Sequence, residues 1–131
     1  MTRQTFYRNL RKYAHMFKWT VNDDGHIRGE LKKKYIDDII DKETLEYSEF
    51  NYKNEYFCPL AAVCLAKEKT LVDGVDFIRA SETLGMLNYD DSFIIADSAD
   101  TYLHEEDRNR SFQSVRRTLL KSVGLNVDKY L

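Results

Sequence analysis

One cysteine stands where a protein could use a thiolate. Cys58 precedes Pro59 at the expected start of a helix, where the helix dipole and free N–H groups can lower a thiol pKa. With His104 and either Asp97 or Asp100, it would complete a cysteine-based hydrolytic triad. However, Cys58 has no glycine elbow around it, and its apolar neighbours indicate burial. We therefore predict a structural cysteine. A small cysteine- or metal-dependent hydrolase is a less favoured alternative function.

The same acidic residues suggest a metal site. Asp97, Asp100 and His104 follow the spacing i, i+3, i+7, so they share a face if one helix runs through them. Two carboxylates and an imidazole can hold a divalent ion, but carboxylates near helix ends more often act as caps. His15 and His26 have no partner at ligand spacing, and CxxC, HExxH, Walker A and GxGxxG elements are absent. We expect no metal, no cofactor and no enzymatic activity.

Basic residues gather on the first and last expected helices. Around an apolar stripe of Phe6, Leu10, Tyr13 and Phe17, the first segment has five basic residues between positions 3 and 18 and no acid before position 23. The last helix has a similar basic face. Solvated faces explain both, but a composite patch could also bind phosphate. The alternative function is therefore a nucleic-acid-binding regulator that uses Arg3, Arg8, Arg11, Lys12, Arg116 and Arg117.

Residues 77–85 and the segment that follows superficially resemble a helix-turn-helix. The second helix of such a pair should carry basic or amide side chains into the major groove. Here it carries Asp90, Asp91, Asp97 and Asp100. Phosphate would repel these side chains, so we do not expect this pair to read DNA.

An acidic and aromatic segment spans residues 41–57. Its density of rings indicates an ordered loop or edge strand that packs on the domain. Tyrosine and phenylalanine are also enriched in interface cores. We predict that this segment binds a protein partner through Glu43, Glu46, Tyr47, Glu49, Phe50 and Tyr52.

These residues are positioned by five or six helices and one β-hairpin, a mainly α (α+β) fold. The hairpin is expected near residues 19–28, with Asp24-Gly25 as a tight turn, and should pack on a helix or gain a further strand. Residues 30–56 are expected to be an insertion or an irregular acidic and aromatic segment within the domain. The expected helices cover 6–17, 59–67, a segment capped by Asp73 and ended by Gly85, a segment that begins at 88, and 108–123. Residues 35–40 suit a short helix, and a strand is the alternative there.

Length and composition favour a single domain over residues 1–131. The chain has 43% hydrophobic residues, a net charge of −2 and two cysteines, which do not make a disulfide framework. We expect no signal peptide, no membrane span and a cytoplasmic location. Residues 1–36 carry nine basic and three acidic side chains, whereas residues 37–57 carry two basic and seven acidic ones. These opposite charges could pair within one copy or between copies of a homo-oligomer.

The layout resembles small phage and prophage proteins. The shared features are a tryptophan hairpin (19–28), Cys58-Pro59 at the start of a helix, a Leu-Gly turn at Leu84-Gly85, and an arginine-rich final helix that ends at Gly124-Leu125. The resemblance implies a phage origin and residence in the cytoplasm of an infected bacterium. It implies no reaction and no catalytic residue.

The main functional hypothesis is a non-enzymatic, protein-binding accessory or regulatory factor. Its target would be a host or phage protein, and an inhibitor of a bacterial defence system is one concrete form. The charge polarity and the segment 41–57 support this hypothesis, together with the lack of a catalytic constellation.

Overall fold

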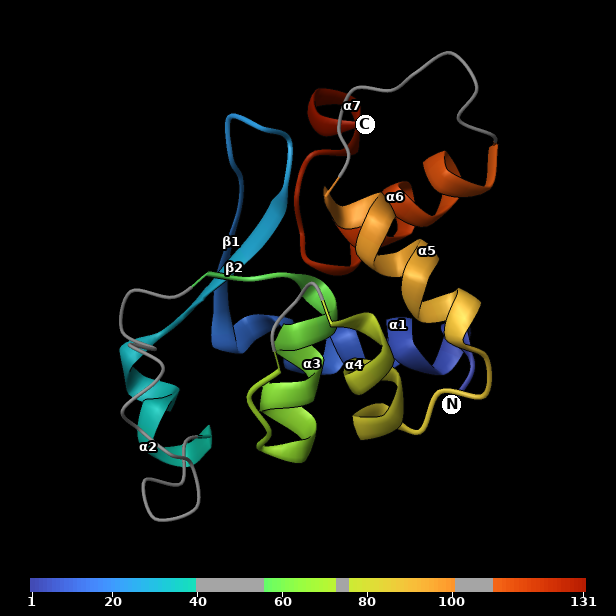
Figure 1. Ribbon diagram of the computed structural model, residues 1–131. Helices are drawn as coiled ribbons and strands as arrows, with labels where there is room; N and C mark the ends of the chain where they lie inside the picture. The colour runs from blue at the N-terminus through green and yellow to red at the C-terminus, as the bar shows by residue number, and fades with distance from the viewer. Residues whose placement is uncertain (40–55, 73–75, 101–109) are drawn as a thin grey trace.

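The computed structural model describes residues 1–39, 56–72, 76–100 and 110–131. In these ranges the chain forms a mainly α domain with a small antiparallel sheet, which confirms the expected fold class (Figure 1). The α-helices are α1 (Arg3–Tyr13), α2 (Ile36–Ile39), α3 (Pro59–Glu68), α4 (Phe77–Leu84), α5 (Tyr89–Asp100), α6 (Arg110–Ser122) and α7 (Val127–Tyr130). The strands are β1 (Phe17–Val21), β2 (Ile27–Leu31) and β3 (Tyr56–Phe57), and short 3₁₀ turns cover Ala14–Met16 and Lys33–Tyr35.

The first helix is shorter than its apolar stripe predicted. It ends at Tyr13, and Phe17 begins β1 instead of closing a fourth helical turn. Phe17 pairs with Leu31 of β2, and both side chains are buried. Pairing with β2 therefore overrides the helical spacing, which cannot show where a period of 3.6 residues changes to a period of two.

The hairpin is confirmed and gains a third strand, because β3 pairs with β2 in the order β1-β2-β3. Its turn is wider than the predicted Asp24-Gly25 pair. The Asn22 side-chain oxygen accepts hydrogen bonds from the backbone N–H groups of Asp24 (3.0 Å) and His26 (2.9 Å). Of the turn residues only Gly25 has a positive φ, of 81°. An asparagine side chain thus supplies the closure that we expected from a two-residue turn.

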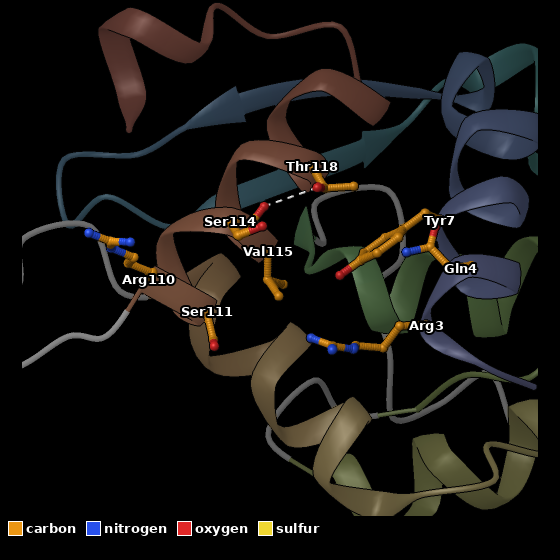
Figure 2. Close-up of a pocket in the computed structure, with 8 residues that line it drawn as sticks. All are labelled: Arg3, Gln4, Tyr7, Arg110, Ser111, Ser114, Val115 and Thr118. Atoms are coloured by element: carbon orange, nitrogen blue, oxygen red, sulfur yellow. Dashed lines mark hydrogen bonds between the residues drawn. The ribbon is translucent and has the colours of Figure 1, made fainter.

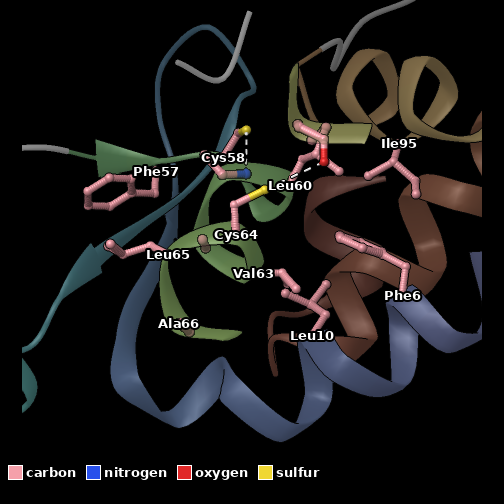
Figure 3. Close-up of a cluster of buried hydrophobic side chains, with 14 of the residues drawn as sticks. Phe6, Leu10, Phe57, Cys58, Leu60, Val63, Cys64, Leu65, Ala66 and Ile95 are labelled. Carbon is pink, nitrogen blue, oxygen red and sulfur yellow. Dashed lines mark hydrogen bonds between the residues drawn. The ribbon is translucent and has the colours of Figure 1, made fainter. Parts of the chain in front are cut away.

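Helix α3 lies at the centre of the domain. Every residue from Pro59 to Ala66 is buried, because this helix contacts α1, α4, α5 and β2. Figure 3 shows Val63 facing Phe6 and Leu10 of α1, with Ile95 of α5 in the same cluster. None of the described helices is long and apolar enough to cross a membrane.

Two helix ends match the sequence signals and one differs. Gly85 and Gly124 adopt the positive φ angles, 64° and 79°, that end α4 and α6. The N-cap of α4 is Asp76, whose carboxylate accepts from the Arg79 N–H at 3.0 Å, whereas Asp73 lies outside the described residues. Helix α7 was not predicted, although its N-cap, Asn126, is a recognisable start signal.

Only part of the expected insertion 30–56 can be compared with the structure. Strand β2 and helix α2 occupy its first residues, and β3 begins at its last. Residues 40–55 lie outside the described ranges, as do all six predicted partner-binding residues: Glu43, Glu46, Tyr47, Glu49, Phe50 and Tyr52. The insertion and its binding role remain predictions.

Candidate functional site

The two basic helices, far apart in the sequence, lie side by side. Helices α1 and α6 are in contact, and each contains four arginine or lysine residues and no aspartate or glutamate. The whole chain nevertheless has a net charge of −2. Cationic side chains are therefore concentrated on one pair of helices, and those of Arg8, Arg11, Lys12 and Arg117 are exposed.

Arg116 does not belong to this surface, which corrects one of the six predicted patch residues. It is only 4% exposed. Its guanidinium donates hydrogen bonds to backbone oxygens of Gly25 at 2.8 Å, Ser98 at 2.9 Å and Tyr130 at 3.0 Å. Carbonyls at the end of α5, in the hairpin turn and near the C-terminus take the place of water around this cation. Arg116 has a structural position, and Arg117 next to it faces solvent.

A polar cleft of about 320 Å³ lies between α1 and α6 (Figure 2). The α1 wall consists of Arg3, Gln4 and Tyr7. The opposite wall consists of Arg110, Ser111, Ser114, Val115 and Thr118, from the N-terminal two-thirds of α6. Helix N-termini favour anions, so the dipole of α6 adds to the positive charge here.

The α1 wall is held by contacts to α5. The Nε of Arg3 lies 3.1 Å from a carboxylate oxygen of Asp91. Burial raises the pKa of Tyr7; the neighbouring Arg3 guanidinium opposes this shift and Asp91 adds to it. Figure 2 shows the Arg3 guanidinium and the Tyr7 hydroxyl directed across the cleft toward α6, whereas the Arg110 guanidinium points away from it. Arg3 is thus the cation already oriented into the cleft.

Cys58 has the buried position expected of a structural cysteine. It is the N-cap of α3, and its Sγ accepts from the Ala61 N–H at 3.4 Å. Burial raises its pKa, an effect larger than the lowering by the Ala61 N–H and by Arg28. The helix N-terminus therefore does not produce a thiolate here. Of the proposed triad partners, His104 lies outside the described residues.

The acids proposed as metal ligands have other neighbours. Asp100 forms an ion pair with Arg28 at 2.7 Å, and the same arginine lies 3.3 Å from Nδ1 of His26. His15 packs edge-on against the ring of Tyr35. Among the residues that the structure describes, no group of three histidine, cysteine, aspartate or glutamate side chains could hold a metal ion.

Helices α4 and α5 expose a second surface, which the sequence analysis missed. Ile78, Tyr89 and Phe93 are about half exposed (49%, 49% and 48%), and Leu87 in the turn between the helices is 80% exposed. The Phe93 ring packs on Phe77 at 5.6 Å between ring centres. The run Phe93-Ile94-Ile95 contained the signal, because three successive helical residues point in three directions and cannot all enter the core.

Acidic side chains are exposed on the same two helices. These are Glu82, Asp90 and the helix cap Asp76, and Arg79 is the one basic residue there. Helices α4 and α5, whose sequence superficially resembles a helix-turn-helix, thus have an apolar and acidic exterior. Comparisons with protein-family models, curated proteins and solved structures found no match for this chain.

Proposed function

We propose that the protein is a non-enzymatic binding factor for another protein, and that the exposed side chains of α4 and α5 form one contact surface. The observation that carries this proposal is the exposure of Leu87, together with Ile78, Tyr89 and Phe93. Large apolar side chains that remain exposed together on one helical pair are characteristic of interaction surfaces. The segment 41–57 remains a second predicted contact with a protein partner.

The exposed charges on α4 and α5 indicate the charge that a partner should carry. Glu82 and Asp90 would repel an acidic protein and attract a basic one. The partner should therefore offer an apolar contact bordered by lysine or arginine. The resemblance to phage proteins adds the proposal that the chain is phage-encoded and cytoplasmic, with a host or phage protein, such as a component of a defence system, as its target.

Site-specific cross-linking tests this proposal. A photoreactive amino acid replaces Leu87 in one variant and Thr20, an exposed residue of β1, in the control. Illumination in a bacterial lysate should give a discrete cross-linked protein with the Leu87 variant and none with the Thr20 variant. Adding L87E protein as an unlabelled competitor should leave this product intact, whereas the unlabelled wild type should remove it. Equal products from both positions would contradict the proposal, and a product consisting of two copies of this chain would identify self-association instead.

A second candidate function is nucleic-acid binding by α1 and α6. The concentration of positive charge favours it, because α1 and α6 carry eight arginine and lysine residues and Arg116 is the one that is buried. Phosphate contacts make affinity fall steeply with salt.

A matched pair of double variants tests this second candidate. R11Q/K12Q should reduce the salt dependence of oligonucleotide affinity by about one phosphate contact for each cation lost. The control K33Q/K34Q removes the same charge from the exposed turn before α2 and should change the slope little. Equal slopes in the two variants, or no binding at low salt, would refute this function.

A further inference from the structure

We propose that the cleft between α1 and α6 is a binding site for a phosphate group. This inference deepens the second candidate function, because it names the group that enters the basic surface and the side chains that receive it. It requires only that the ligand carry a phosphate, which a nucleic acid or a small phosphate ester would supply.

Arg3 is the first reason. A guanidinium presents a planar set of N–H donors that matches two phosphate oxygens at once. Arg3 is fixed in place by Asp91 at its Nε, and its guanidinium is directed across the cleft (Figure 2). An arginine held in this way loses little side-chain freedom when an anion binds.

The opposite wall is the second reason. Ser111 and Ser114 lie in the first turns of α6, with Thr118 one turn further, and all three residues line the cleft. The Thr118 hydroxyl donates to the Ser114 backbone oxygen at 3.0 Å, so it can still accept but does not offer its proton. A tetrahedral anion needs donors on several sides, and two serine residues line the wall opposite Arg3.

The size and the remaining lining agree with this ligand. About 320 Å³ equals the space of about ten water molecules, enough for a phosphate and the first atoms of its ester. None of the eight lining residues is acidic. Arg110 at the open end is exposed, and its long side chain could turn toward a bound anion.

The test titrates the protein with inorganic phosphate while backbone amide signals are recorded by NMR, with sodium chloride at matched ionic strength as the reference. We compare wild type with Q4E, which places a carboxylate in the cleft, and with Q113E, which adds the same charge on α6 outside the cleft. Both glutamines are exposed and lie in first helical turns, where an acidic side chain does not weaken the helix.

We expect saturable shifts at Ser111 and Ser114 in wild type and Q113E, and at least tenfold weaker phosphate binding in Q4E because of repulsion at close range. No saturable shift in wild type, or equal affinities in Q4E and Q113E, would overturn the inference.

A second titration with a single-stranded oligonucleotide separates the two proposals. We expect Q4E to bind it more weakly than Q113E does. Oligonucleotide binding that is equal in the two variants, while phosphate binding stays weaker in Q4E, would place the nucleic-acid contact outside the cleft and identify a small phosphate ester as the ligand of the cleft. Phosphate binding without oligonucleotide binding would refute the nucleic-acid function and identify a small phosphate ester as the source of the group.

Discussion

Replacing Arg116 by methionine should strongly destabilise the fold, although its neighbour Arg117 can be replaced freely. The buried guanidinium joins three parts of the chain through backbone oxygens of Gly25, Ser98 and Tyr130, at 2.8–3.0 Å. A hydrogen bond from a charged donor contributes about 1.5–3 kcal/mol, so three contribute roughly 4.5–9 kcal/mol. The R116M variant no longer carries the desolvation cost of a buried charge, and this offsets several kcal/mol of the loss. We expect a net loss of about 3 kcal/mol in the free energy of unfolding.

Urea unfolding, followed by the fluorescence of the single tryptophan, Trp19, measures this loss. Trp19 is a suitable probe because its indole N–H donates to the Ala14 carbonyl at 2.9 Å and its ring contacts Phe17, so unfolding changes its surroundings. R117M is the matched control, since it removes the same group from the next, exposed residue and should change stability by at most about 0.5 kcal/mol.

A difference of less than about 1 kcal/mol between R116M and R117M would refute this reasoning. It would mean that the burial cost of the guanidinium cancels its hydrogen bonds. The carbonyl contacts would then position α6 relative to the hairpin without stabilising the domain.

Four further predictions concern individual residues. Cys58 and Cys64 should resist thiol labelling in the native state, because both are buried, and a rapid reaction of one equivalent would contradict this. Burial raises the pKa of Cys64 to about 12, so the unfolded thiol loses its proton first as pH rises. Unfolding titrations should therefore show that the free energy of unfolding falls from about pH 9 toward pH 12. Below about pH 8 this thiol should not change the free energy of unfolding. G29A should lower the free energy of unfolding by about 1–3 kcal/mol, because the new methyl would lie 3.0 Å from the Trp19 ring. A urea midpoint equal to that of the wild type would show that the ring can move aside. D76A should cost about 1 kcal/mol through the lost N-cap of α4, whereas loss of the whole helix from the circular dichroism spectrum would mean that the cap has a larger role.

The sequence alone determined the local elements of this protein. Pro59 starts α3, Gly85 ends α4, and the continuous apolar run of α3 requires a central position; each is confirmed. These signals act between residues a few positions apart, so they do not depend on the rest of the fold. Where two local patterns competed, as at Phe17, only strand pairing with the distant Leu31 decided the outcome.

The candidate sites depended on tertiary structure. The cleft joins Arg3 and Gln4 to residues more than 100 positions later, and no local pattern encodes that contact. Arg116 had a partial signal, because it lies four residues from Phe112 and from Leu120 on the apolar stripe of α6. Spacing could place it toward the core but could not show that carbonyls from three distant segments would receive its charge. The sequence determined which faces are apolar and which are basic; the packing of the helices decided which basic residue is buried and which two faces form a cleft.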